Sequence, residues 1–217
     1  MLTFPKSAAF GRRFPKQKFY EHLEVDPQVK HLLVEQVKLI VWAYKLSPQT
    51  VNLSPGQAVG EIQVFQLALT GPELDERVTQ LMDRQIPYHL LFLLERPDGL
   101  QRLRIDYKEA SQSGHNAFQL RQSYQTDWVR PEDLSLDLTA LDMDGLYESI
   151  VRQIAGDAIT APEAETLKAA VEQTQEKEKR LRQIEALRAK MRKEKSLAKQ
   201  MEIRREIMKL EGGFHND

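Results

Sequence analysis

The stretch from Ile86 to Ser111 constrains the fold most, because it joins two strand-like runs through a turn. Tyr88–Glu95 is largely apolar and has the length of a strand. Arg96–Gly99 reads RPDG, where proline presets φ, aspartate can bond nearby backbone and glycine accepts a positive φ. From Leu100 to Tyr107 apolar and charged residues alternate, which is the period of a sheet with one face in water. These features predict a β-hairpin with a central first strand and a half-exposed second strand.

Periodicity predicts further elements on both sides of this hairpin. Apolar residues at helical spacing indicate helices over residues 26–46, 74–82 and 142–154, the first opened by Asp26-Pro27 and closed by Ser47-Pro48. Alternating apolar residues indicate strands over residues 61–70 and 118–128. Helices and strands in this order favour an α/β, or mixed α+β, domain with a central sheet and flanking helices.

The C-terminal part predicts a long helix with coiled-coil character. Residues 163–211 contain no proline or glycine, and apolar side chains recur about every 3.5 residues, so an unbroken helix would be roughly 70 Å long. The apolar seam is narrow and polar residues interrupt it, so a second copy, a larger partner or the body of the protein should cover it. The seam consists of Leu181, Ile184, Leu187, Met191, Met201 and Met208.

Length and composition bound the class of protein. A chain of 217 residues with 41% apolar content can bury a sizeable core, and the absence of cysteine excludes disulfides and thiolate metal sites. The longest apolar runs are far shorter than the roughly 20 residues of a membrane span, and the N-terminus lacks the apolar region of a signal peptide. We therefore expect a cytoplasmic protein with no membrane association. The breakers in residues 156–162 (GDAITAP) suggest three parts: a basic aromatic arm (1–20), a globular α/β domain (21–156) and a long charged helix (163–211).

Both ends of the chain are basic and the middle is acidic. Residues 1–20 carry five basic and no acidic side chains, residues 176–211 carry thirteen basic and seven acidic ones, and residues 21–175 hold 13 basic and 24 acidic ones. The ends can contact nucleic acid or can be held against the acidic body. For the arm, we favour docking of its aromatic residues on the core, with its charges left in water. The candidates for nucleic-acid contact are Arg12, Arg13, Lys16, Lys18, Arg192, Lys193 and Lys195.

Carboxylates and a lysine raise the alternative of a magnesium-dependent nuclease. Asp98 and Asp106 cannot share one metal ion. Asp98 lies at the tip of the predicted hairpin, and Asp106 lies about eight strand residues away from it, which is roughly 26 Å. A version with Glu61, Asp106 and Lys108 on neighbouring strands remains open and would need Mg²⁺. Ordinary exposed strand ends explain these three residues better, so we expect no cofactor and no catalysis.

The remaining motifs favour no particular chemistry. The five histidines have no metal-binding spacing, and neither a phosphate-binding glycine loop nor a serine-nucleophile elbow is present, so no metal site is expected. Polar residues could still converge at one end of the sheet, where sites tend to gather, although a hydrogen-bonded loop is the simpler interpretation. This candidate polar site consists of His89, Tyr107, Lys108, Glu109, Ser111, His115, Asp127 and Trp128.

A set of sequence strings resembles an uncharacterised bacterial family, a domain of unknown function. The strings are LxxxMDRQIPYHLLFLLE, IDYKEAS, NAF, YxTDW, LDMDGLYESIVRQIAG and MRKEKSLAKQMEIRREIMKL, with FPKQKFYEHL near the start. Members look like companions of a DNA methylase and a helicase of restriction or phage-defence type, and the resemblance carries over no catalytic residues.

The resemblance and the seam together lead to one hypothesis. We expect a non-catalytic accessory or scaffolding subunit of a DNA-processing system, docked through its C-terminal helix to a helicase, to a methylase or to a second copy of itself. Direct DNA binding by the basic ends and the magnesium-dependent nuclease stay as alternatives.

Overall fold

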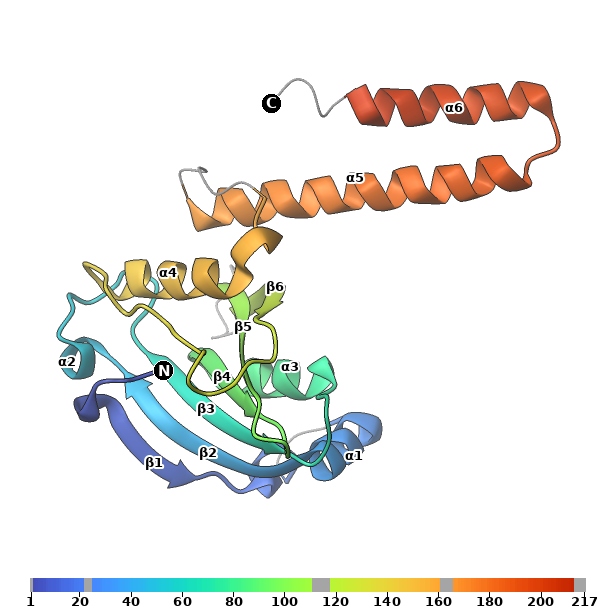
Figure 1. The fold of residues 1–217 in the computed structure, drawn as a ribbon. Helices are drawn as coiled ribbons and strands as arrows, with labels where there is room; N and C mark the ends of the chain where they lie inside the picture. Colours follow the sequence, from blue (N-terminus) through green and yellow to red (C-terminus); the bar gives the residue numbers. More distant parts are fainter. Residues whose placement is uncertain (1, 22–24, 111–117, 161–165, 213–217) are drawn as a thin grey trace. The chain divides into compact units, whose positions relative to one another are not determined.

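The computed structural model describes residues 2–21, 25–110, 118–160 and 166–212 (Figure 1). The chain divides into two compact units, Met1–Gly156 and Asp157–Asp217. The first unit contains η1 (Lys6–Ala8), β1 (Ala9–Arg13), η2 (Lys16–Phe19), α1 (Pro27–Gln36), β2 (Val37–Leu46), α2 (Pro48–Val51), β3 (Ile62–Leu69), α3 (Glu76–Gln85), β4 (His89–Glu95), β5 (Gln101–Ala110), β6 (Phe118–Gln125) and α4 (Met143–Ala155), followed by η3 (Gly156–Ala158) at the boundary. The second unit contains α5 (Leu167–Lys193) and α6 (Leu197–Gly212).

The first unit is built on a six-stranded sheet whose strands follow the order of the chain, β1-β2-β3-β4-β5-β6. All neighbours are antiparallel except β3 and β4, which are parallel and are joined through α3. This confirms the mixed α+β fold class, with a central sheet, flanking helices and a long C-terminal helix.

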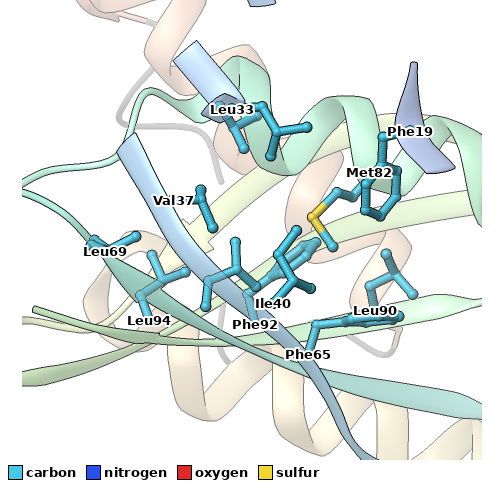
Figure 2. Close-up of a cluster of buried hydrophobic side chains, with 12 residues drawn as sticks. Phe19, Leu33, Val37, Ile40, Phe65, Leu69, Met82, Leu90, Phe92 and Leu94 are labelled. Atoms are coloured by element: carbon cyan, nitrogen blue, oxygen red, sulfur yellow. The ribbon is translucent and has the colours of Figure 1, made fainter. Parts of the chain in front are cut away.

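Helices cover both faces of the sheet. On one face Leu33 of α1 and Met82 of α3 pack on alternate residues of the central strands, such as Phe65 and Phe92, in the core cluster of Figure 2. On the other face the ring of Tyr147 in α4 lies 4.2 Å from the ring of His89. Because neighbouring strand residues point to opposite faces, β4 is covered on both sides and is buried along almost its whole length.

The predicted hairpin is confirmed. Gly99 has φ of 85°, a conformation that glycine adopts without steric cost, and its N–H donates to the carbonyl of Arg96 at 3.0 Å. The strand expected over 61–70 pairs with β4 as β3, and the helices expected over 74–82 and 142–154 correspond to α3 and α4.

The helix expected over residues 26–46 is wrong in its second half. Asp26 caps α1 as predicted, its carboxylate accepting from the N–H of Gln28 at 2.8 Å, but α1 ends at Gln36 and the chain continues as β2. The β2 segment is rich in β-branched and aromatic residues, which prefer the pleated sheet. Its pairing with β1 and β3 settles what the apolar stripe alone left ambiguous.

The half-exposed face expected for β5 is also wrong. Arg104, Asp106 and Lys108 are only 6%, 0% and 2% exposed. They lie on the face that α3 covers, because Arg104 pairs with Phe92 of the core and Lys108 contacts Asp83 of α3.

The long C-terminal helix is present as α5, but it does not continue to residue 211. Glu194 takes an extended conformation with ψ of 132°, and α6 begins at Leu197 and runs back beside α5 (Figure 1). Glu194 stabilises this break, since its carboxylate accepts from the N–H groups of Lys195 and Ser196, each at 2.9 Å.

Candidate functional site

A row of charged side chains runs along β5 beneath α3. Arg102, Arg104, Asp106 and Lys108 occupy alternate positions of the strand and so share one face. Transferring a charge from water to a protein interior costs several kcal/mol unless partners compensate it, so packing alone does not explain these residues. Buried ionisable groups of this kind make the row the first place to look for a site.

Lys108 is the most enclosed member of the row. Its ammonium lies 2.7 Å from the Asp83 carboxylate, and both side chains are fully shielded from solvent. The same ammonium donates to the carbonyls of Tyr88 and Asp83. One carboxylate and two carbonyl groups therefore surround the ammonium, so Lys108 is held as a structural cation in this conformation.

The carboxyl partner of Lys108 has a shifted pKa. Burial raises the pKa of Asp83 well above its usual value, and the neighbouring Asp106 carboxylate raises it further, while the Lys108 ammonium acts in the opposite direction. Asp106 in turn lies 3.4 Å from the guanidinium of Arg104. Two carboxyl groups and two cations therefore form one continuous buried network.

Tyr147 and His89 close the network from the α4 side. The Tyr147 hydroxyl donates to the carbonyl of Asp106 and accepts from the N–H of Lys108, each at 3.1 Å. Burial lowers the pKa of His89 to about 3, assisted by the Lys108 charge, so its imidazole is neutral at neutral pH. Its ring packs 4.7 Å from Phe118 and 4.2 Å from Tyr147, which is the environment of a core histidine.

The candidate polar site is assembled only in part. His89, Tyr107 and Lys108 lie at one end of β5, and the Tyr107 hydroxyl donates to Glu109 at 3.2 Å. Trp128 lies at the other end of β5, where its ring packs 4.4 Å from the guanidinium of Arg102. Asp127 is next to it in the chain, and Ser111 and His115 lie outside the described residues.

The structure does not bring the three nuclease candidates together. The Glu61 carboxylate pairs with Lys45 of β2 at 2.8 Å, whereas Lys108 pairs with Asp83 and Asp106 contacts Arg104. Within the described ranges no three histidine or acidic side chains could hold a metal ion. Sequence reasoning missed Asp83 and Tyr147, both of which belong to helices that were interpreted only by their apolar stripes.

The basic N-terminal segment is part of the fold. Phe19 is 2% exposed in the core, with Phe14 and Tyr20 packed against the same cluster, which confirms docking of the aromatic residues. The Lys16 ammonium donates to the carbonyls of Val34 and Val37 at 3.1 and 2.7 Å.

The other candidates for nucleic-acid contact in this segment, Arg12, Arg13 and Lys18, lie on or beside the edge strand. The guanidinium of Arg12 lies 4.7 Å from the Phe10 ring, and the Lys18 ammonium lies 5.6 Å from the Phe14 ring. Arg13 pairs with Val41 in the ladder between β1 and β2 and has an exposed side chain.

The second unit closes part of its seam on itself. Ile184 of α5 packs with Ile203 and Ile207 of α6, and Leu187, Met191 and Leu210 surround them. The other predicted seam residues remain in water: Leu181, Met201 and Met208 are 45%, 53% and 63% exposed.

The basic candidates of the C-terminal part gather where the two helices meet. Arg192 and Lys193 end α5, and Lys195 lies in the turn. Lys190 and Lys199 flank them, and Glu194 is the one acidic residue from 190 to 199. The turn is therefore the most basic part of the second unit.

Comparisons with known proteins give one match. The family model described as "Domain of unknown function (DUF4391)" matches residues 2–212 and so spans both units. No curated protein and no solved structure matches the chain. None of the helices in the described part of the chain has the length and apolar character that crossing a membrane requires. With the family model matched over nearly its whole length, the chain belongs to the family of domain of unknown function DUF4391.

Proposed function

We propose that the protein is a cytoplasmic, non-catalytic accessory subunit of a bacterial DNA-processing system of restriction or phage-defence type. In this proposal the second unit docks onto a helicase or methylase subunit, and the sheet unit serves as the scaffold that carries it. The resemblance of the sequence strings to companions of such enzymes supports the DNA-processing context.

The observation that carries the proposal is an apolar stripe on α6. Leu197, Met201 and Met208 are 72%, 53% and 63% exposed. At 100° per residue these three positions fall within about 40° of one another around the helix axis. Ile203 and Ile207, which face α5, lie about 120° and about 80° away from Leu197 on the same axis. A helix with one apolar side against its neighbour and a second in water is typical of an element that inserts into a groove of another protein.

The buried charged row supports a binding role over catalysis. Lys108 and Asp83 form an ion pair that is fully shielded from solvent, so neither is available to a substrate in this conformation. The nuclease alternative would require Lys108 to separate from Asp83, Asp106 to become accessible and Glu61 to separate from Lys45.

Copurification tests the proposal. The tagged full-length chain is coexpressed with a bacterial helicase and a DNA methylase of restriction or phage-defence type as the proposed partners, and the recovered complex is quantified. We expect Met201→Glu/Met208→Glu to reduce recovery at least ten-fold, because two charges would enter an apolar contact. Gln173→Glu/Gln183→Glu, which adds the same charge at exposed positions of α5, should leave recovery unchanged. Equal recovery with all three chains would refute docking through this stripe.

A second candidate function is nucleic-acid binding by the turn between α5 and α6. The gathering of Arg192, Lys193 and Lys195 at this turn favours it over binding by the N-terminal cations, of which Lys16 is engaged by the backbone. Phosphate contacts release counterions, so the affinity for a DNA duplex should fall steeply with salt, and the slope should decrease on Arg192→Gln/Lys193→Gln/Lys195→Gln. Salt-independent affinity would exclude this function.

A further inference from the structure

A small pit lies at the end of β5 opposite to Lys108, next to the first turn of α3. Arg102, Arg104 and Trp128 line it, with Glu73 and Glu76 at its mouth. Its enclosed volume is about 10 Å³, which is room for about one water molecule. Anything larger must enter by displacing the side chains at the mouth.

Each of the two arginines has one donor, its Nε–H, that the protein does not use, while the terminal nitrogens of Arg104 make long contacts of 3.5 and 3.4 Å with Gln125 and Asp106. Their side chains are only 13% and 8% exposed. The Nε–H groups of both are buried, and neither has a hydrogen-bond partner among the described residues. The guanidinium of Arg102 lies 4.4 Å from the ring centre of Trp128, which holds it at the pit. Buried donors without acceptors are costly, and a ligand with several acceptor oxygens would remove that cost.

The two glutamates are weak occupants of the mouth. A carboxylate oxygen of Glu73 lies 3.6 Å from Arg102, and one of Glu76 lies 3.6 Å from Arg104, so both separations exceed hydrogen-bond length. The glutamate side chains are 66% and 62% exposed, and exposed pairs of this kind contribute little stability. Glu73 has one good hydrogen bond, from the Trp128 indole N–H at 3.1 Å.

We propose that the pit binds a phosphate monoester group, which replaces the carboxylates of Glu73 and Glu76 over Arg102 and Arg104. The two glutamates supply two negative charges, and a phosphate monoester carries nearly the same charge at neutral pH, so the exchange preserves the charge balance. A single carboxylate would restore only half of it. Guanidinium groups match phosphate oxygens in pairs, and the indole N–H released by Glu73 becomes a further donor. This inference does not rest on the proposed function.

Tryptophan fluorescence tests it directly. The chain has two tryptophans, so Trp42→Phe leaves Trp128, which lines the pit, as the sole tryptophan. Titration of this variant with inorganic phosphate and with a nucleoside monophosphate should give a saturable change in emission, whereas acetate should give none. Equal affinity for the two phosphates would assign the site to the phosphate group alone, and tighter binding of the nucleotide would assign it to a nucleotide-bearing ligand.

Two variants with opposite expected effects separate binding from loss of structure. Glu73→Gln/Glu76→Gln removes the competing carboxylates and should tighten phosphate binding roughly ten-fold. Arg102→Lys keeps the charge but loses the paired donors and should weaken binding roughly ten-fold. Glu132→Gln/Glu172→Gln makes the same charge change at exposed positions elsewhere and should have no effect.

The proposal is overturned by either of two results. One is the absence of saturation up to about 10 mM phosphate, in both the Trp42→Phe protein and its Glu73→Gln/Glu76→Gln derivative. The other is a tightening by Glu132→Gln/Glu172→Gln as large as that by Glu73→Gln/Glu76→Gln, which would indicate attraction by overall charge.

Discussion

Lys108 and Asp83 form an ion pair in which both side chains are out of contact with water. Removing one member leaves the other charge buried without compensation, which typically costs about 3–5 kcal/mol. We therefore expect Lys108→Met to lower the free energy of unfolding by about 3–5 kcal/mol in a urea titration.

The control for this prediction is the partly exposed pair of Lys45 and Glu61. Lys45→Met should cost less than about 1 kcal/mol, because the Lys45 side chain is 40% exposed and water screens the pair. Asp83→Leu/Lys108→Met should recover most of the stability that Lys108→Met loses, since an apolar pair can replace a buried ion pair. A double variant as unstable as the single one would show that the pair is not the cause.

His89 should make the stability depend on pH. Burial lowers the pKa of His89 from 6.5 to about 3, so between these values the unfolded chain binds a proton that the folded protein does not. Stability contributed by the neutral imidazole is therefore complete above pH 6.5 and is lost as the pH falls, by up to about 1.4 kcal/mol per unit.

The comparison variant is His89→Phe, which cannot titrate. The difference in unfolding free energy between the natural protein and this variant should shift by about 2 kcal/mol against the natural protein between pH 7 and pH 5. The carboxyl groups are the same in both proteins, so their contribution to the pH dependence cancels in this difference. A difference independent of pH would mean that His89 is protonated in the folded protein.

At the residue scale, the sequence could indicate some site residues but not their partners. His89, Tyr107 and Lys108 stand out because polar side chains border an apolar strand, and the structure brings them together. The alternation of apolar and charged residues in β5 predicted that its charged face is exposed, because charged faces of sheets are usually in contact with water. Only the packing of α3 over this face shows that Asp106 is buried and that Asp83 is the partner of Lys108.

At the element scale, features that depend on neighbouring residues in the chain were predictable, and features that depend on tertiary contacts were not. The turn at Gly99 depends on residues within it, so its sequence suffices. The apolar pattern of residues 37–46 fits a helix as well as a strand, and the segment forms a strand because it pairs with β3. The break after α5 has neither proline nor glycine, because the Glu194 side chain caps the turn instead.

The contact between α5 and α6 gives a prediction at this scale. Ile203 is 6% exposed in the cluster with Ile184, so Ile203→Asp should detach α6 and reduce helical ellipticity in far-UV circular dichroism. Met208 is 63% exposed on the same helix, so Met208→Asp should leave the spectrum unchanged. Equal loss of helix in both variants would contradict the assignment of the buried and exposed sides.

At the scale of the whole molecule, the family model spans residues 2–212. The first unit, with its sheet, and the helical hairpin formed by α5 and α6 therefore occur together in this family. The acidic charge is concentrated in the middle of the chain, with 24 acidic and 13 basic side chains over residues 21–175. The basic N-terminal segment is built into the sheet as β1 and η2, whereas the basic C-terminal segment forms its own compact unit. We therefore expect the second unit to carry the contacts with macromolecular partners.

Hydrogen exchange of the full-length chain, alone and mixed with the proposed helicase or methylase partner, tests this account most directly. Amides of α6 should be the most strongly protected by the partner, because the stripe of Leu197, Met201 and Met208 becomes covered. Amides of β3, β4 and β5 should exchange equally in both states. Protection confined to the sheet, with α6 exchanging as fast in the complex as in the free protein, would contradict docking through the helical hairpin.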